Sequence, residues 1–156
     1  MNIGIIGTGF VGGATLEVLK TKHQMFPYDK YKKPYNSEEN LRSLATNSEV
    51  VFICVPTPMK PSGEIDYSAI YDSIESLEKE TEKVNRKKEE ILVVIRSTAV
   101  SGTTDKLVEK YKFKFAFNPE FLIEKTAIDD MKNTDRIIIG AEEESSRKKL
   151  ESVYKP

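Results

Sequence analysis

The sequence is poor in cysteine and histidine, with one residue of each among its 156 residues. A single cysteine excludes an internal disulfide framework and fits a reducing compartment, the cytoplasm. No apolar run approaches the length that spans a membrane, so we expect no membrane partner. The 24 basic and 25 acidic residues leave a net charge of −1, which gives no indication of nucleic acid as a partner. An apolar run begins at residue 2 with no charged segment before it, so we also expect no leader peptide.

The length and the distribution of apolar residues indicate one domain, residues 1–156, that is large enough to bury a core. Short apolar runs predict strands near 2–6, 24–28, 49–55, 91–96, 113–117 and 136–139. Segments of helical spacing alternate with them near 10–21, 37–46, 67–83, 101–111 and 143–153, with a short one near 121–127. The runs at 50–55 and 91–95 are apolar throughout, which is typical of parallel strands covered on both faces. We therefore predict an α/β fold of Rossmann type, doubly wound around a mostly parallel sheet.

Local signals mark helix starts and one long loop. Ser37 precedes two glutamates and predicts a helix start, as does Asp66 before Tyr67. The stretch from Pro56 to Gly63 is the longest loop-like segment. It follows a predicted strand, at the edge of the sheet where this architecture binds ligands.

Residues 2–12 contain the most informative motif, an apolar strand that leads directly into Gly-x-Gly-x-x-Gly. Gly7 lets the chain turn sharply off the strand, Gly9 lets a pyrophosphate approach the backbone, and Gly12 lets the next helix pack closely on the strand. The free N–H groups of that helix then favour phosphate. A glycine-rich turn in an unrelated α/β protein is the alternative, but here strand, helix, second strand and acid follow in register.

The acid is Asp29, which ends the second predicted strand. A carboxylate at this position accepts hydrogen bonds from the adenine ribose and repels a 2′-phosphate, so it predicts NAD rather than NADP. Lys30, Lys32 and Lys33 follow immediately and leave NADP open. These lysines could bind a 2′-phosphate or form a solvated loop.

Four further segments follow predicted strands. They are Cys54 to Pro58, Arg96 to Thr104, Phe117 to Lys125, and Asn133 to Gly140. These segments contain Val-Pro-Thr-Pro, Ser-Thr-x-x-x-Gly-Thr-Thr, Asn-Pro-Glu-Phe-Leu and Asp-Arg-Ile-x-Ile-Gly. In this order, the motifs resemble the N-terminal domain of the nucleotide-sugar 6-dehydrogenases, the UDP-glucose and GDP-mannose dehydrogenase family. The resemblance covers the chain from the glycine motif to Gly140.

The resemblance implies an oxidoreductase that converts the C6 alcohol of a UDP-sugar or GDP-sugar to a carboxylate with two NAD. It implies Glu120 as the acid/base that activates water against a thioester, and Thr98 as the residue that helps to organise that water. The implied contacts with NAD come from Gly7, Thr8, Gly9, Phe10, Val11, Gly12, Asp29, Val55, Pro56, Thr57, Ser97 and Glu124. Phe121, Leu122 and Glu124 are implied to touch the nucleotide sugar, largely through the backbone.

Each of these residues also has a purely structural interpretation. Glu120 could start a helix, where the dipole favours an acid. Ser97 and Thr98 could cap a helix, and Thr57 could belong to a rigid turn between two prolines. Cys54 is expected to be a small core residue, because it does not match the catalytic cysteine of the family.

That cysteine, the long central helix and the C-terminal substrate domain lie beyond the matched region, so we expect none of them in these 156 residues. The oligomeric state is left open for the same reason. One hypothesis is that the chain is the cofactor half of a nucleotide-sugar 6-dehydrogenase. Another is a stand-alone NAD-binding module with no complete catalytic activity. A β-hydroxyacid dehydrogenase would share the glycine motif, but the segment at 118–122 argues against it.

Overall fold

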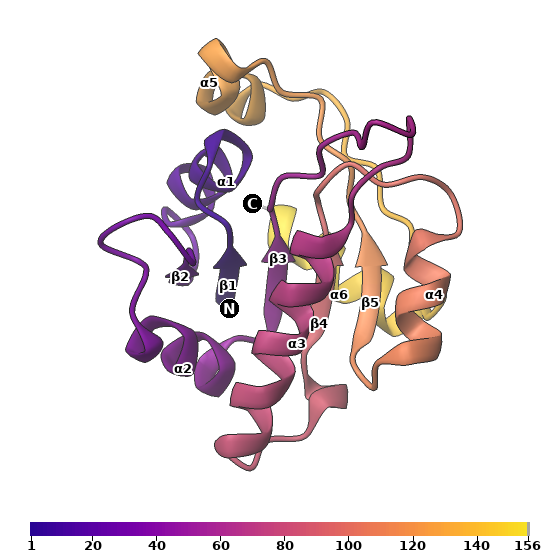
Figure 1. Cartoon of the computed structure of the whole chain (residues 1–156). Coiled ribbons are helices and arrows are strands. Elements are labelled where there is room, and N and C mark those ends of the chain that lie inside the picture. Colours follow the sequence, from indigo (N-terminus) through magenta and orange to yellow (C-terminus); the bar gives the residue numbers. More distant parts are fainter. Residues whose placement is uncertain (156) are drawn as a thin grey trace.

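Five parallel strands form the centre of the structure, a computed structural model that describes residues 1–155. The strands are β1 (Asn2–Ile6), β2 (Gln24–Tyr28), β3 (Val50–Ile53), β4 (Leu92–Ile95) and β5 (Lys114–Phe117), in the order β2-β1-β3-β4-β5 (Figure 1). Every residue of β3 and of β4 is buried, as their continuous apolar runs predict. The predicted α/β fold of Rossmann type is confirmed.

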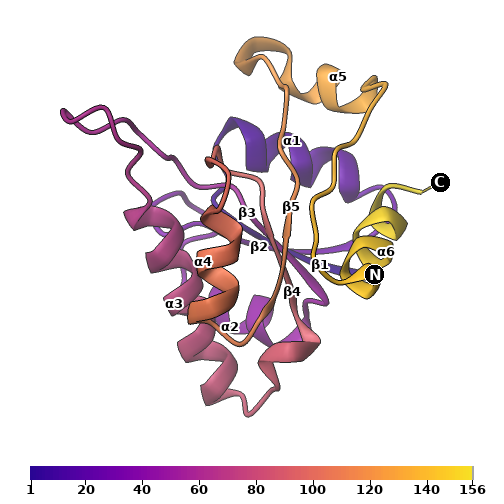
Figure 2. The same ribbon diagram turned by 90° about the vertical axis from the view of Figure 1, so that its right-hand side faces the viewer.

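Helices cover both faces of this sheet. They are α1 (Phe10–Leu19), α2 (Glu38–Asn47), α3 (Ser68–Lys83), α4 (Thr103–Lys110), α5 (Ala127–Lys132) and α6 (Glu144–Tyr154), with short 3₁₀ helices at Lys88–Glu90 and Glu124–Thr126. Buried residues of α1, α5 and α6 pack together with alternate residues of the strands, and those of α2, α3 and α4 pack with the other set. Figure 2 shows the two layers on opposite sides of the sheet.

The predicted sixth strand near 136–139 is wrong. This segment meets β5 at one antiparallel bridge only, where the backbones of Phe117 and Gly140 exchange two hydrogen bonds of 2.7 and 2.8 Å. The carbonyl of Ile138 accepts from the side chain of Asn118 at 2.8 Å instead of from a neighbouring strand. Ile137 and Ile138 are also exposed, and of the isoleucines in this run Ile139 alone packs against the core.

Helix positions agree with the sequence except in one region. The helix predicted near 121–127 forms later, as the 3₁₀ helix at Glu124–Thr126 followed by α5. Ser37 precedes α2 as predicted, and its hydroxyl accepts a hydrogen bond from the backbone N–H of Asn40. Asp66 accepts from the N–H of Ser68 at the start of α3.

No helix within residues 1–155 has the length and apolar character that crossing a membrane requires.

The ends of the strands are in register, and this alignment builds the site. Ile6 pairs with Tyr28 and with Ile53, and Ile53 pairs in turn with Ile95. The residues that follow these strands therefore meet at one edge of the sheet. The chain passes from β1 to β2 on one side and later to β3 on the other, so the edge between β1 and β3 is the topological switch point where such folds bind ligands.

Candidate functional site

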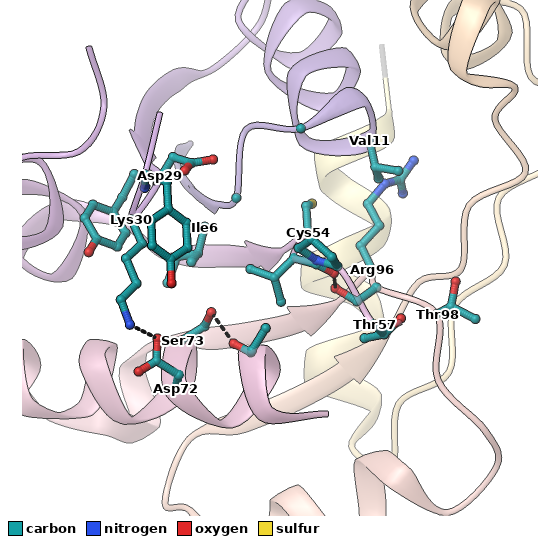
Figure 3. Close-up of a pocket in the computed structure, with 18 of the residues that line it drawn as sticks. Ile6, Val11, Asp29, Lys30, Cys54, Thr57, Asp72, Ser73, Arg96 and Thr98 are labelled. Atoms are coloured by element: carbon teal, nitrogen blue, oxygen red, sulfur yellow. Dashed lines mark hydrogen bonds and ion pairs between the residues drawn. The ribbon is translucent and has the colours of Figure 1, made fainter. Parts of the chain in front are cut away.

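A cavity of about 830 Å³ lies at the switch point, at the carboxyl ends of β1, β2, β3 and β4 (Figure 3). Asp29, Lys30 and Asp72 lie at one end, and Thr57, Arg96 and Thr98 at the other. Most of the predicted cofactor-binding and catalytic residues line it, namely Gly7, Gly9, Phe10, Val11, Asp29, Val55, Pro56, Thr57, Ser97, Thr98 and Glu120. This volume is in the usual range for sites that hold small molecules and cofactors.

The glycine motif forms the tight connection from β1 to α1. Gly7 has a φ of 90°, which strains any residue with a side chain, and a Cβ there would lie 2.6 Å from the carbonyl oxygen of Cys54. A Cβ on Gly12 would lie 1.9 Å from the carbonyl oxygen of Gly7. These two glycines are therefore required for the fold itself.

Gly9 is different, because a Cβ there would meet no protein atom within 4 Å. It lines the cavity beside the first residues of α1, and no acidic residue occupies the first turn of that helix. The first N–H groups of a helix have no acceptor within the helix and favour negative charge. The open space at Gly9 and this helix end together fit the pyrophosphate of a dinucleotide.

Asp29 is held in place by four hydrogen bonds. One oxygen, Oδ2, accepts from the backbone N–H and the hydroxyl of Thr8 at 2.7 and 3.1 Å, and the other accepts from the N–H groups of Tyr31 and Lys32 at 2.9 Å each. Burial raises the pKa of Asp29, but these donors outweigh it, so the pKa is lowered and the group is anionic. The bond from the Thr8 hydroxyl is the longest of the four and the only one from a side chain.

Two of the three lysines after Asp29 are already engaged. The ammonium of Lys30 donates to Asp72 on α3 at 3.0 Å, and the ammonium of Lys32 donates to the carbonyl of Thr8 at 2.9 Å. Lys33 is exposed and does not line the cavity. Asp72 had no signal as a site residue in the sequence, because it lies on α3, 42 positions after its partner Lys30.

The opposite end of the cavity is formed by the exits of β3 and β4. The hydroxyl of Ser97 donates to the carbonyl of Val55 at 2.7 Å and approaches that of Ile53 at 3.2 Å, so Ser97 joins the two strand exits and does not cap a helix. Thr98 is exposed and lines the same end of the cavity as Thr57. These residues offer hydroxyl and backbone groups, and no charge.

Cys54 also lines this cavity but is 8% exposed. Burial raises the pKa of its thiol to about 12, with Arg96 lowering it and Glu120 raising it. The thiolate is the nucleophilic form of cysteine, and this raised pKa disfavours it near neutral pH. The prediction that it is a core residue is consistent with this burial.

Glu120 lies where two cavities meet. It lines the first cavity and a smaller one of about 290 Å³ between α1, α5 and α6, and its carboxylate accepts from the N–H of Leu122 at 2.5 Å. Glu120 therefore does not start a helix. Phe121 and Leu122 line only the smaller cavity, and the ring of Phe121 faces the guanidinium of Arg136 at 5.2 Å.

Arg96 forms the wall between the two cavities. The sequence alone predicts no role for this residue. It is 6% exposed and donates to Asn118 at 2.5 Å and to Tyr154 at 3.1 Å. Within residues 1–155 it pairs with no carboxylate, and its Nε atom has no hydrogen-bond partner. Its signal in the sequence is a charge directly after a fully apolar strand.

Three of the predicted site residues lie away from both cavities. Thr8 and Gly12 are buried beneath the glycine loop and shape it from behind. Glu124 is exposed at the start of a 3₁₀ helix and lines neither cavity.

In the described part of the chain, residues 1–155, no group of His, Cys, Asp and Glu side chains is placed to hold a metal ion.

The doubly wound sheet, the glycine loop and the acid after β2 together define a dinucleotide-binding domain of Rossmann type. Residues 28–156 match the profile of the UDP-glucose/GDP-mannose dehydrogenase family, NAD binding domain. The chain belongs to this family and is its NAD-binding domain, and the homologues are dehydrogenases.

Relatives and solved structures agree with this assignment. A UDP-glucose 6-dehydrogenase of Rickettsia felis is 30% identical over all of the chain, which corresponds to 41% of that protein. A UDP-glucose dehydrogenase from Pyrobaculum islandicum superimposes with a TM-score of 0.82 at 26% identity, over 98% of this chain and 43% of that one. A ternary complex of a Pseudomonas GDP-mannose dehydrogenase gives 0.76 at 27% identity, over 99% and 44%. The chain thus spans about two fifths of the length of these relatives.

Proposed function

We propose that the first cavity holds NAD, with the adenosine at the Asp29 end, the pyrophosphate at Gly9 and the nicotinamide at the Thr98 end. The single observation that carries this placement is the alignment of the strand ends, which puts Gly9, Asp29 and Thr98 around one cavity. Bound NAD supplies a hydride acceptor. In this proposal Asp29 orients the adenine ribose, and the N–H groups of α1 balance the charge of the phosphates.

We propose further that this domain serves the oxidation of a UDP-sugar or GDP-sugar at C6. The naming of the relatives supports the substrate class, since they are UDP-glucose 6-dehydrogenases and the chain covers 41% to 43% of those from Rickettsia. Phe121 and Leu122 border the smaller cavity next to Glu120, which suits contacts with a sugar nucleotide. Glu124 follows this segment but lines neither cavity, so in this proposal it does not touch the sugar nucleotide through its side chain.

Glu120 is the proposed acid/base. It is half-buried where the two cavities meet, so its carboxylate can reach a water molecule between the nicotinamide end of the first cavity and the substrate side. Thr98, with an exposed hydroxyl on the same cavity wall, can hold that water by a hydrogen bond. The single cysteine is buried, which fits the proposal of a reducing, cytoplasmic location.

Titration of the chain with NAD in a calorimeter tests the cofactor proposal. We expect saturable binding of one NAD per chain, and an absence of binding at millimolar NAD would contradict it. A second assay adds UDP-glucose and follows NADH by its absorbance. We expect no sustained NADH production by these 156 residues, because the second oxidation passes through a thioester and the only thiol, that of Cys54, is buried with a pKa of about 12.

Steady NADH production would contradict this expectation and would mean that the chain contains a complete active site. Binding without turnover fits both a cofactor half and a stand-alone NAD-binding module. Restored turnover on addition of a separate cysteine-bearing domain of a relative would favour the cofactor half.

A further inference from the structure

An ion pair spans the adenosine end of the first cavity, between the exit of β2 and helix α3. The ammonium of Lys30 donates to Oδ2 of Asp72 at 3.0 Å, and both residues line the cavity. Figure 3 shows the Lys30 side chain extending from beside Asp29 toward α3, where Asp72 meets it. The Asp72 carboxylate raises the pKa of Lys30, so the ammonium is charged.

Among residues 1–155, Lys30 is the only lysine that lines the first cavity. Lys32 directs its ammonium to the carbonyl of Thr8 at 2.9 Å, and Lys33 lines neither cavity. The carboxylate of Asp29 is fixed by four hydrogen bonds and is anionic. Two carboxylates and one engaged ammonium thus surround the place where a ribose 2′ substituent would lie.

We propose that Asp72 is a specificity-determining residue, which holds Lys30 and thereby selects a free ribose 2′-hydroxyl over a 2′-phosphate. This inference rests on the proposed function, which puts the adenosine at the Asp29 end of the cavity. A 2′-phosphate needs a cation, so it would have to draw Lys30 away from Asp72. It would then lie beside an unpaired carboxylate of Asp72 as well as that of Asp29. An uncharged 2′-hydroxyl leaves the ion pair of Lys30 and Asp72 intact and is not repelled by the two carboxylates.

The test measures the Kd of NAD and of NADP by calorimetry at low ionic strength, for the chain and for Asp72→Asn. The variant removes the charge that holds Lys30 and keeps the size of the side chain. We expect the ratio of the NADP Kd to the NAD Kd to fall roughly tenfold, the scale of one charge-assisted hydrogen bond at a part-exposed site. Moderate salt should reduce the effect, because both groups are solvent-accessible.

Two further variants separate this mechanism from a general change of charge. Glu75→Gln alters the same charge on the same helix, but Glu75 pairs with Lys110 and does not line the cavity, so the ratio should not change. In the double variant Lys30→Met with Asp72→Asn, the gain for NADP should disappear, since no ammonium is released.

Three results would overturn the inference. They are a chain that already binds NADP as tightly as NAD, an Asp72→Asn variant with an unchanged ratio, and a double variant that keeps the whole gain. Each of these can occur while NAD still binds, so they leave the cofactor proposal intact. A chain that binds neither dinucleotide would instead remove the cofactor proposal, and this inference with it.

Discussion

At the residue scale, Gly9 separates ligand binding from folding. It lines the cavity, yet a Cβ there would touch no protein atom within 4 Å, whereas a Cβ on Gly7 or Gly12 would collide with backbone. We expect Gly9→Val to abolish NAD binding, because the side chain would fill the space of the pyrophosphate. The thermal unfolding midpoint without ligand should remain close to that of the parent chain.

Gly13→Ala is the matched control for this substitution. Gly13 lies in α1, just after Gly9 and outside the cavity, and a Cβ there would be 3.7 Å from the carbonyl oxygen of Thr8, an ordinary contact. Calorimetry should show NAD binding retained in Gly13→Ala and lost in Gly9→Val. Unchanged affinity in Gly9→Val would mean that the glycine loop is not the site.

The thiol of Cys54 gives a second prediction. Burial raises its pKa to about 12 from 9.0, so the thiolate fraction at pH 8 is about a thousandfold smaller than for a free cysteine. We expect iodoacetamide to modify the folded chain at least about a hundredfold more slowly than the chain unfolded in urea. Mass spectrometry of timed samples measures both rates. Equal rates would show that Cys54 is accessible in the folded chain and that its thiol can react as a nucleophile.

Site residues could be predicted from the sequence where their role depends on near neighbours. Gly7, Gly12 and Asp29 belong to one strand–helix–strand unit, whose spacing is fixed by local geometry. The contacts of Asp72 and Arg96 could not be predicted, because their partners are distant in the chain. Asp72 meets Lys30 from α3, and Arg96 meets Tyr154 at the end of α6. Periodicity carries no information on such contacts.

At the element scale, burial on both faces made the strands predictable. β3 and β4 are apolar at every position, so their location follows from composition alone. The run Ile137 to Ile139 is just as apolar but forms no strand. The side-chain amide of Asn118 donates to the carbonyl of Ile138, and the segment is joined to β5 only by the bridge between Phe117 and Gly140. A side chain elsewhere in the chain thus decides the outcome.

Helix α2 offers an element whose start can be tested directly. Its hydroxyl cap is Ser37, which accepts from the N–H of Asn40 at 3.1 Å, and two glutamates occupy the first turn. We expect Ser37→Ala to lower the free energy of unfolding by about 1 kcal/mol, because the N–H of Asn40 loses its acceptor. Urea denaturation followed by circular dichroism measures this loss.

Thr46→Ala in the same helix is the control. Thr46 is exposed near the end of α2, and its hydroxyl bonds only to the carbonyl of Arg42 within that helix. Alanine has the higher helix propensity, so this variant should be neutral or slightly stabilised. Equal destabilisation of the two variants would contradict a capping role for Ser37.

At the scale of the whole molecule, one polar cluster, buried at Arg96 and Asn118 and half-buried at Tyr154, joins three distant parts of the chain. Arg96 follows β4, Asn118 follows β5, and Tyr154 ends α6, and their side chains are mutually hydrogen-bonded. Asn118 also donates to the carbonyl of Ile138, which attaches the segment after α5 to the same cluster. The cluster therefore fixes the segment that carries Glu120 relative to the sheet.

Tyr154 makes this cluster sensitive to alkaline pH. Burial raises its pKa to about 12, while the Arg96 guanidinium acts to lower it, and its ordinary value is 10.0. The unfolded chain loses the Tyr154 proton above pH 10, but the folded chain keeps it until about pH 12. The stability contributed by this group is complete below pH 10 and falls between these values by up to about 1.4 kcal/mol per pH unit.

Tyr154→Phe should separate this effect from the other groups that titrate at high pH. Below pH 9 the variant should be about 1 kcal/mol less stable, because Arg96 and Asn118 lose a hydrogen-bond partner. Above pH 10 only the parent chain carries the Tyr154 penalty, so the difference between the two urea denaturation curves should shrink and then reverse. Tyr31→Phe, which changes a tyrosine that is 83% exposed, should follow the parent chain throughout. A constant difference from pH 7 to 11 would mean that folding does not raise the pKa of Tyr154.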